Sequence, residues 1–291
     1  IKKREFYLFG SPISQSRSPA LHNTLFGITG LPHEYHLHET SSAENLGEVL
    51  HSESFGGASV TIPLKRDVMA LVDELTPAAQ AIGAVNTIIP LNDDIPSNKR
   101  RLLGDNTDWK GMVYTLSEAG VVNPIKNESA AVIGSGGTTR AAIYALHFMG
   151  FKTIYVVGRD AHKVNTLTSE FPKDYNVNAI TEPAQAADFT HSPSVIISTI
   201  PADQPIANGV KGVVFTLLSL SAVSRVKRVL LEMAYKPHRT QIVQMAESTG
   251  TWTVIPGLEV LASQGWYQFE AWTGIQPLYH RARDAVVGSA F

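Results

Sequence analysis

The chain has no cysteine among its 291 residues. Cysteine supplies disulfide bonds, thiolate ligands for metals and thiol nucleophiles, so its absence excludes all three kinds of chemistry. A cysteine-free chain fits a reducing compartment, and no signal-peptide core follows the opening Ile1-Lys2-Lys3-Arg4-Glu5. We therefore expect a cytoplasmic protein.

An excess of charge and long apolar runs are also missing. The 24 Lys and Arg residues balance 26 Asp and Glu residues, which gives a net charge of −2 and no global attraction to nucleic acid or anionic membranes. The basic run Lys99-Arg100-Arg101 is interpreted as a solvated hairpin face. No apolar run approaches the roughly 18 residues of a membrane span. We predict neither a nucleic-acid nor a membrane partner. Hydrolase and NTPase functions lack support, because the chain has neither a G-x-S-x-G nor a Walker A motif.

What the chain does have is strand–helix alternation, over a length that predicts about two domains. In the first region we expect strands over 5–9, 35–37, 58–62, 85–90 and 101–103, and helices over 18–29, 43–51, 67–72, 77–82 and 108–119. A polar loop over 92–99 separates the last two strands. This order predicts an α/β layer.

A second unit begins near residue 129. We expect strands over 130–133, 153–157, 195–199, 213–217, 229–233 and 253–255, with helices over 138–149, 161–170, 221–228 and 240–248. This repeated order predicts a Rossmann-type, doubly wound parallel sheet.

A glycine turn joins the first strand and helix of the second unit. It reads Gly134-Ser135-Gly136-Gly137-Thr138-Thr139-Arg140, with Thr139 at the third glycine position of the G-x-G-x-x-G pattern. Glycines let backbone N–H groups approach a pyrophosphate, and the helix N-terminus adds its positive dipole. The context predicts dinucleotide binding.

The end of the next strand should lie near the adenosine ribose. An acid there favours NAD, whereas basic residues favour NADP by binding its 2′-phosphate. Gly158 occupies that strand end, and Arg159 and Lys163 follow it with positive charge. The pattern favours NADP, while Asp160 keeps NAD open.

Three polar segments of the first region attract attention. The loop from Ser11 to Pro19 is crowded with hydroxyl groups. Capping of a helix explains Ser18 but leaves Ser14 and Ser16 unexplained. A strand ends at Ser59–Lys65, and Gly104–Asp108 places two acids before a helix, where N-capping would explain one of them.

Taken together, these segments resemble the shikimate dehydrogenase family across essentially the whole chain. The resemblance rests on Ser14-Gln15-Ser16-Arg17-Ser18-Pro19, Ser59–Lys65, Gly83-Ala84-Val85-Asn86-Thr87, Gly104–Asp108, the glycine turn, Tyr235-Lys236-Pro237 with Thr240, and Pro256-Gly257-Leu258 through Gln264-Gly265. The details at 231–237 and 257–261 are similar to the shikimate dehydrogenase domain of the fungal pentafunctional arom polypeptide. Because that domain is C-terminal, we expect this chain to be a piece of a longer polypeptide, covalently linked to other arom domains.

The resemblance implies reversible reduction of 3-dehydroshikimate to shikimate with NADPH, in aromatic amino-acid biosynthesis. It makes Lys65 and Asp108 the catalytic pair. It implies substrate contacts at Ser14, Ser16, Thr61, Asn86, Tyr235 and Gln264, and cofactor contacts at Gly134, Ser135, Gly136, Gly137, Thr138, Arg140, Arg159 and Lys163. Hydride arriving at a ketone leaves an alkoxide that needs a proton, which a lysine can deliver.

The resemblance and the motif order also predict the domain boundaries. We expect a substrate domain over 1–110, completed by C-terminal helices over 258–291, and an NADP-binding domain over 111–257. Two alternatives remain open. One is a regulatory domain of the same fold that senses quinate or shikimate without turnover, and the other is an NAD-dependent quinate dehydrogenase.

Two further clusters receive ordinary interpretations. His33, His36 and His38 are taken as surface histidines, because no carboxylate has metal-ligand spacing to them, and no metal is predicted. The aromatic stretch Trp266, Tyr267, Phe269 and Trp272 is interpreted as core or interdomain packing, with Gln264 as the polar exception beside it.

Overall fold

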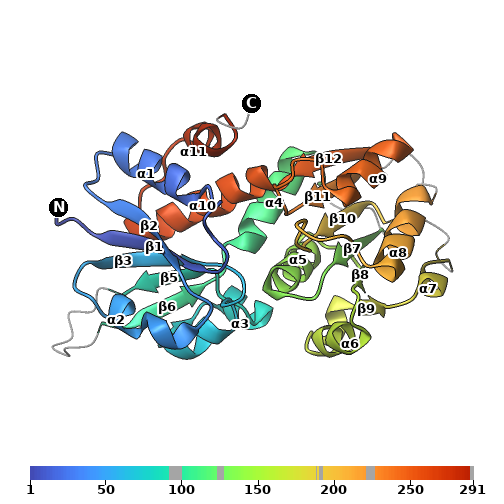
Figure 1. Ribbon diagram of the computed structural model, residues 1–291, viewed down its shortest axis with the longest axis horizontal. Helices are drawn as coiled ribbons and strands as arrows, with labels where there is room; N and C mark the ends of the chain where they lie inside the picture. The colour runs from blue at the N-terminus through green and yellow to red at the C-terminus, as the bar shows by residue number, and fades with distance from the viewer. Residues whose placement is uncertain (92–99, 123–127, 188, 190–192, 221–226, 289–291) are drawn as a thin grey trace. The chain divides into compact units, whose positions relative to one another are not determined.

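The computed structural model describes residues 1–291 except 92–99, 123–127, 188, 190–192, 221–226 and 289–291 (Figure 1). Two compact units divide the chain. Unit 1 comprises Ile1–Gly111 and Leu261–Phe291, and unit 2 comprises Met112–Val260. Their boundaries fall within two helices, α4 (Asp108–Glu118) and α10 (Gly257–Thr273).

Unit 1 is built around a mixed six-stranded sheet. Its strands are β1 (Glu5–Gly10), β2 (Glu34–Glu39), β3 (Phe55–Val60), β4 (Glu74–Leu75), β5 (Thr87–Pro90) and β6 (Leu102–Asp105), in the order β2-β1-β3-β5-β6-β4. The pairs β1–β2, β1–β3 and β4–β6 are parallel, whereas β3–β5 and β5–β6 are antiparallel. Its helices include α1 (Ser18–Ile28), α2 (Gly47–Leu50), α3 (Pro77–Ile82), α11 (Tyr279–Val286) and the 3₁₀ helices η1 (Ala43–Leu46) and η2 (Asp67–Leu71).

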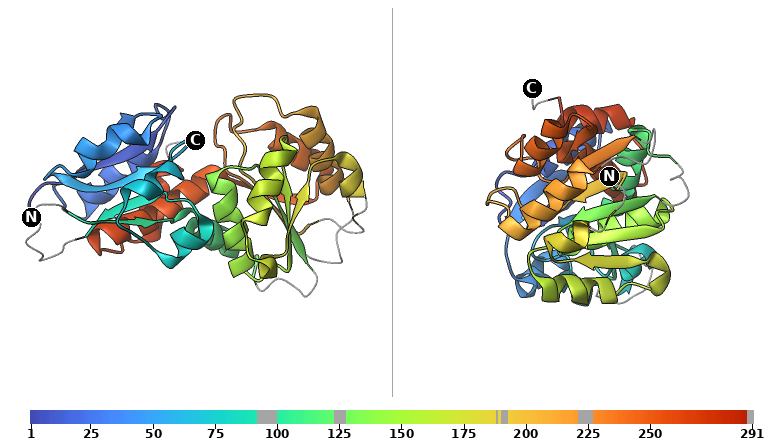
Figure 2. Two further views of the ribbon diagram at one scale, coloured as in Figure 1. Left: turned by 90° about the horizontal axis from the view of Figure 1, so that it is seen from below. Right: turned by 90° about the vertical axis from the view of Figure 1, so that its right-hand side faces the viewer.

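Alternation along β1 explains why helices cover both faces of this sheet. Phe6 faces α1 and α10, where its ring lies 4.9 Å from Phe26 and 5.2 Å from Trp272. Phe9 belongs instead to the core cluster that includes Leu50 of α2. Figure 2 shows these helices from two further sides. The prediction of core packing for the aromatic stretch on α10 is thus confirmed for Phe269, which is fully buried, and for Trp272, which contacts Phe6. Trp266 and Tyr267 are partly buried.

Unit 2 is a parallel six-stranded sheet. Its strands are β7 (Ser129–Ile133), β8 (Thr153–Val157), β9 (Val177–Ile180), β10 (Val195–Ser198), β11 (Arg228–Glu232) and β12 (Trp252–Pro256), and its sheet order is β12-β11-β10-β7-β8-β9. The helices are α5 (Gly137–Phe148), α6 (Ala161–Ser169), α7 (Pro183–Ala187), α8 (Asn208–Ser219), α9 (Gln241–Thr249) and the 3₁₀ helix η3 (Lys173–Tyr175). Numbered from β7, this is the 3-2-1-4-5-6 order of dinucleotide-binding folds, which confirms the predicted fold class.

In that fold, ligands bind where the strand order reverses, at the carboxyl ends of the strands. Here the reversal falls between β7 and β10, which pair in parallel from Val195–Ala130 to Ser198–Ile133. The glycine turn follows β7 directly, so it lies at this switch point.

One predicted strand is wrong, because residues 213–217 belong to helix α8. The β-branched run Val213-Val214 favours a strand locally. However, Val210, Val213, Val214, Leu217 and Leu218 recur at helical spacing and are all buried in one core cluster of unit 2. Tertiary burial therefore outweighs the local propensity.

Other differences concern shorter elements. Strands β4 and β9 and helix α7 were not predicted, and the expected helix over 67–72 is the 3₁₀ helix η2. The predicted loop over 92–99 and most of the predicted helix over 221–228 lie outside the described residues. No helix in the described part of the chain is long and apolar enough to cross a bilayer.

Candidate active site

Lys65 and Asp108 form the centre of a polar cluster in unit 1. The Nζ of Lys65 lies 2.5 Å from Oδ2 of Asp108, and their side chains are only 12% and 8% exposed. Lys65 follows the turn after β3, and Asp108 begins α4. The fold therefore joins two predicted site residues from distant segments in a mostly buried ion pair.

Asn86 holds the second oxygen of Asp108. Its Nδ2 donates to Oδ1 of Asp108 at 2.8 Å, and its Oδ1 accepts the backbone N–H of Thr107 at 2.7 Å. A backbone N–H can only donate, so this bond is one of those that direct Nδ2 of Asn86 toward Asp108. Asn86 is 2% exposed.

Gln264 joins the same cluster from α10. Its Oε1 accepts from Nδ2 of Asn86 at 3.1 Å and from the Thr107 hydroxyl at 3.2 Å. Close packing makes this possible, since a Cβ on Gly111 would lie 2.8 Å from the Cβ of Gln264. The absence of a side chain at residue 111 thus lets α4 approach α10 at Gln264.

The predicted cap of α1 is wrong. The residue before the helix is Arg17, and no side chain caps that end. Instead the Ser16 hydroxyl accepts the backbone N–H of Ser18 at 3.2 Å and donates to the Ser18 hydroxyl at 3.2 Å. Ser18 itself is 4% exposed. The helix starts one residue earlier than a Ser18 cap requires, so Ser18 becomes its first residue and turns inward.

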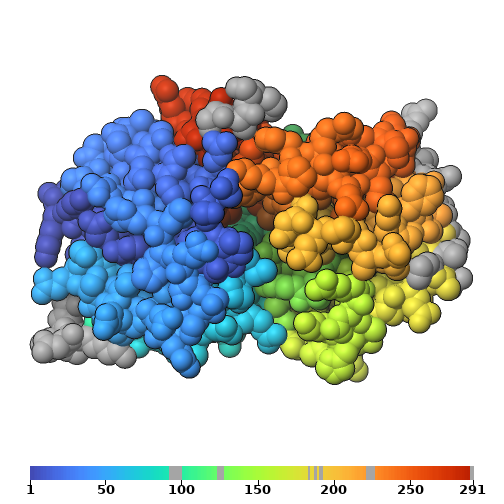
Figure 3. Space-filling model, in the orientation of Figure 1, coloured from blue at the N-terminus to red at the C-terminus, as the bar shows by residue number. Residues whose placement is uncertain are grey.

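Ser14 and Thr61 lie on two neighbouring loops of unit 1. Ser14 is exposed, and Thr61 follows β3. Figure 3 shows unit 1 as a space-filling surface, with residues near the N-terminus in dark blue. The loops are joined by the backbone bonds from Thr61 N–H to Phe9 (2.8 Å) and from Ser11 N–H to Ile62 (2.9 Å). Their place beside each other agrees with a shared ligand, but their roles stay predictions.

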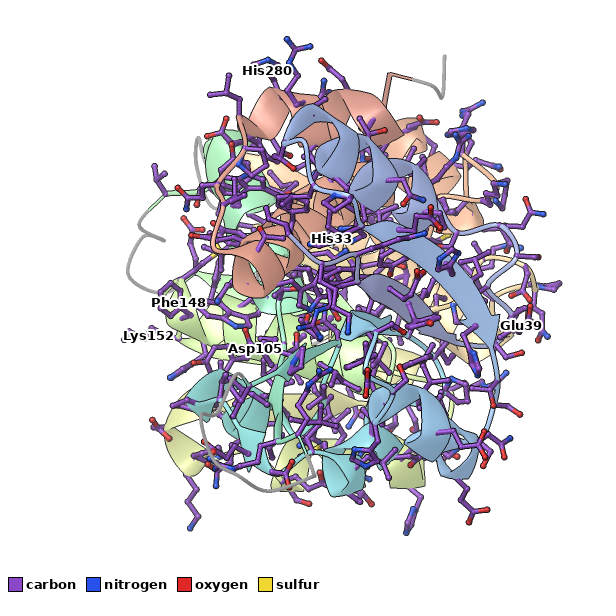
Figure 4. All side chains as sticks on the ribbon, turned by 90° about the vertical axis from the view of Figure 1, so that its left-hand side faces the viewer. His33, Glu39, Asp105, Phe148, Lys152 and His280 are labelled. Atoms are coloured by element: carbon purple, nitrogen blue, oxygen red, sulfur yellow. The ribbon has the colours of Figure 1, made fainter. Side chains whose placement is uncertain are left out.

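Neither acid of the segment 104–108 supplies the predicted helix cap. Oδ1 of Asn106 accepts the backbone N–H of Asp108 at 3.1 Å. Asp105 instead accepts the Thr76 hydroxyl at 2.6 Å, while Asp108 pairs with Lys65. The amide oxygen of Asn106 thus accepts the N–H of the first helical residue, and both carboxylates have other partners. Figure 4 labels Asp105 within unit 1.

The glycine turn of unit 2 is shaped by two threonine hydroxyls. The Thr139 and Thr199 oxygens lie 2.8 Å apart, and the Thr139 hydroxyl also accepts the N–H of Gly136 at 3.1 Å. Gly134 has φ +137°, and a Cβ there would lie 2.2 Å from the Thr199 oxygen. Only glycine fits beneath this pair.

The remaining predicted cofactor residues divide into two groups. Arg140 is buried, with its guanidinium 2.5 Å from Glu170 and over the ring of Phe171 at 5.1 Å. This gives Arg140 a packing role inside unit 2, and its contact with a cofactor stays a prediction. Arg159 and Lys163, by contrast, are exposed.

Asp160 caps helix α6. Its Oδ1 accepts the backbone N–H of Lys163 at 3.0 Å, and this bond lowers the pKa of Asp160 below its usual value. The carboxylate that kept NAD open in the sequence therefore has a local structural partner.

Tyr235 lies on the segment after β11, and it is partly buried. That segment is held by Glu232, whose carboxylate accepts the N–H of Ala234 at 3.1 Å and the hydroxyl of Thr240 at 2.8 Å. Burial raises the pKa of Glu232. Glu232 and Thr240 also line a hollow of unit 2 with Pro201 and Gln204.

The histidine cluster has carboxylates nearby after all, which the sequence spacing did not indicate. Strand β2, which runs from beside His33 to Glu39 (Figure 4), pairs in parallel with β1, so Glu5 and Glu34 meet His36. Their ligand atoms lie within 4.8 Å of one another. However, Lys3 lies 2.8 Å from Glu34 and 3.5 Å from Glu5, so a cation already neutralises these acids.

Several residues of the cluster were not predicted from the sequence. Thr107 bonds to Asn86 and Gln264, and Gln268 bonds to the backbone oxygen of Asn86 at 3.0 Å. The sequence does offer an indication of Gln268, because it is a second polar side chain four residues after Gln264 in a helix rich in aromatic residues. That spacing places both on one helix face.

Comparisons with known proteins agree on one family. The substrate-binding domain of shikimate dehydrogenase matches residues 8–88, shikimate/quinate 5-dehydrogenase matches 118–213, and the shikimate 5'-dehydrogenase C-terminal domain matches 257–287. The matched family implies an oxidoreductase, which agrees with the dinucleotide-binding fold and the mostly buried lysine–aspartate pair. The chain belongs to the shikimate dehydrogenase family.

Solved structures give the same result. The dehydroquinate dehydratase and shikimate dehydrogenase of S. pombe AroM is 38% identical with a TM-score of 0.78, over 99% of this chain and 53% of that one, so this chain spans about half of it. Shikimate dehydrogenase of Mycobacterium tuberculosis is 29% identical with a TM-score of 0.80, over 98% of this chain and 99% of that one. The Thermus thermophilus enzyme, solved with NADP(H) and shikimate, is 26% identical with a TM-score of 0.76, over 97% and 98% of the two chains.

Proposed function

We propose that this chain catalyses the reversible, NADPH-dependent reduction of 3-dehydroshikimate to shikimate. The observation that carries the proposal is the cluster of Lys65, Asp108, Asn86 and Gln264, which four separate segments bring into one hydrogen-bonded group. Membership of the family supports the same activity.

Lys65 is the proposed proton donor. Reduction of a ketone leaves negative charge on its oxygen, and a lysine ammonium carries three N–H donors, one of which is directed at Asp108. Asp108 holds that ammonium in place, and Asn86 holds Asp108 from its other oxygen. In the reverse direction, neutral Lys65 accepts the proton of the substrate hydroxyl.

The polar side chains around the pair suit a polyhydroxylated acid. Amide and hydroxyl groups of Asn86, Gln264 and Thr61 are proposed to bind ring hydroxyls, with Tyr235 as a further contact. Ser14 and Ser16 are proposed to bind the carboxylate. At Ser16 the hydroxyl hydrogen that now points to Ser18 would turn to the ligand at little cost, since a 3.2 Å bond is long for two hydroxyls.

The residues present fit a dinucleotide in unit 2. A Cβ on Gly136 would meet no atom within 4 Å, and the turn opens onto the N-terminus of the 12-residue helix α5. The N–H groups of Ser135, Gly137 and Thr138 would hold the pyrophosphate, with Gly134 and Gly136 giving the backbone its close approach. NADPH supplies the hydride when it is bound.

Arg159 and Lys163 are proposed to favour NADP by binding its 2′-phosphate. Both are exposed and follow the end of β8. Asp160 caps α6 and so does not have the role of the acid that binds the ribose in NAD-specific folds.

Three finer proposals come from the resemblance and the neighbours. We propose the domain limits 1–110 with 258–291 for the substrate domain and 111–257 for the cofactor domain, and a cytoplasmic location. We also propose covalent linkage to other arom domains, since the S. pombe neighbour is one chain that contains a dehydroquinate dehydratase and a shikimate dehydrogenase. The mass of the native polypeptide tests the linkage.

The activity is tested by nicotinamide absorbance in four mixtures, with shikimate or quinate and with NADP or NAD. The expected result is the highest kcat/KM with shikimate and NADP. Faster turnover of quinate with NAD would identify a quinate dehydrogenase. Calorimetric binding of shikimate or quinate by folded protein with no turnover in any mixture would identify a sensor domain.

A further inference from the structure

A buried glutamine on α10 connects two parts of the proposed site. Gln268 is 1% exposed and lies one helical turn after Gln264. Its Nε2 donates to the backbone oxygen of Asn86 and to the Thr87 hydroxyl, both at 3.0 Å. Its Oε1 accepts the Ser59 hydroxyl at 2.9 Å. Both donors of its Nε2 and one acceptor position of its Oε1 are thus used within unit 1.

The direction of these bonds is determined by the groups at one end. The backbone oxygen of Asn86 can only accept, so the NH₂ of Gln268 must face it. The Thr87 hydroxyl therefore accepts from Gln268 and donates its own hydrogen to Oδ1 of Asn86 at 2.7 Å. Together with the N–H of Thr107, this bond leaves Nδ2 of Asn86 facing Asp108.

The other end of Gln268 leads toward the serine loop. Ser59 donates to Gln268, so it accepts the Tyr35 hydroxyl at 2.7 Å. Tyr35 in turn accepts a hydrogen bond from Ser18, which accepts from Ser16 at 3.2 Å. Every hydroxyl in this chain donates in the same direction, from Ser16 toward Asp108.

We propose that Gln268 is a positioning residue for turnover, which orients Asn86 against Asp108 and couples the Asp108–Lys65 pair to the Ser16–Ser18 hydroxyls. This inference rests on the proposed function, since it assigns Gln268 to the same site. A glutamine that only filled the core would need its bonds satisfied but would not set the orientation of Asn86.

Replacement of Gln268 by glutamate separates these two roles. A protonated carboxyl group keeps one acceptor for Ser59 and one O–H donor for the Asn86 oxygen, whereas an ionised one has no donor and faces that oxygen. The titratable groups that face residue 268 are His22 of α1 and Tyr35 of β2. In wild type, burial lowers the pKa of His22 to about 3 and raises that of Tyr35, so neither titrates between pH 5 and pH 9. In the variant, a new ionisation in this range therefore belongs to residue 268 together with His22, which it faces.

The experiment measures kcat/KM for shikimate with NADP from pH 5 to pH 9 in wild type, Gln268→Glu and the control Gln80→Glu, which lies exposed on α3. For Gln268→Glu we expect a new ionisation that lowers kcat/KM at least roughly tenfold as pH rises, and recovery toward wild type at low pH. The control should follow the wild-type profile.

If wild type turns over shikimate and Gln268→Glu stays within about twofold of it across the range, the inference is overturned while the proposed function stands. If wild type has no turnover in any mixture, the proposed function fails and the inference fails with it.

Thr87→Val is the second variant, in case Gln268→Glu does not fold. It removes only the hydroxyl that links Gln268 to Asn86. We expect kcat to fall at least about fivefold while the shikimate KM stays within about twofold. An unchanged kcat would overturn the inference.

Discussion

The hydroxyl oxygens of Thr139 and Thr199 lie 2.8 Å apart in unit 2, at the switch point between β7 and β10. Thr139 stands where the dinucleotide fingerprint usually has its third glycine. Its hydroxyl also accepts the N–H of Gly136, so the side chain stabilises the turn with a hydrogen bond that a glycine cannot make.

Thr139→Gly therefore restores the third glycine of the G-x-G-x-x-G motif, and yet it should weaken cofactor binding. The variant loses two hydrogen bonds and adds a flexible residue in the first turn of α5, each worth about 1 kcal/mol. We expect the NADP Kd, measured by calorimetry, to rise roughly tenfold. Thr139→Ser, which keeps the hydroxyl, is the control. Tighter binding by the glycine variant would contradict the account.

Arg159 should determine the preference for NADP. Arg159→Ala removes the charge proposed to meet the 2′-phosphate, so we expect the KM for NADP to rise about tenfold and the KM for NAD to stay nearly constant. Asp160→Asn is the matched control, because asparagine caps helices as well as aspartate does. If the asparagine variant instead raised the KM for NAD, the carboxylate of Asp160 would have a role at the ribose and its assignment to capping alone would be wrong.

The burial of His22 predicts that the folded protein loses stability in acid. The ring is fully buried between Tyr35 and Trp272, and burial lowers its pKa from 6.5 to about 3. The unfolded chain binds a proton below pH 6.5 and the folded one does not, so the free energy of unfolding should fall as pH drops from 6.5 toward 3, by at most about 1.4 kcal/mol per pH unit.

Urea titrations at several pH values measure this slope in wild type, His22→Gln and His280→Gln. His280 is exposed, so the last variant should keep the wild-type slope. The His22 variant should lose part of it. Equal slopes in all three proteins would show that His22 carries no such linkage.

Local patterns predicted most of the architecture. Strand–helix alternation and the glycine turn after β7 are local features, and both predicted sheets are present. The wrong strand over 213–217 shows the limit of this approach, because only burial of residues three, four, seven and eight positions apart distinguishes α8 from a β-branched strand. Short elements such as β4 depend on a partner strand far along the chain, here β6.

Site residues that belong to a sequence motif could be predicted. Site residues that are defined only by hydrogen bonds to distant segments could not. Lys65, Asp108, Asn86 and Gln264 follow from the family resemblance, and the structure brings them together. Ser16, and not Ser18, accepts a backbone N–H at the start of α1. This depends on the residue at which α1 begins, which the sequence pattern does not determine to within one residue. Gln268 needed the packing of α10 against β5 to reveal its partners.

The most direct test of the central claim compares wild type with Lys65→Met by the rate of NADPH formation from shikimate and NADP. Loss of the proton-transferring group should lower kcat by 10² to 10⁴, in the range typical of general acid–base catalysis, while shikimate binding measured by calorimetry changes little. Lys152→Met, an exposed lysine of unit 2, is the control and should keep wild-type turnover. An unchanged kcat in folded Lys65→Met protein would remove Lys65 from the reaction and contradict the account.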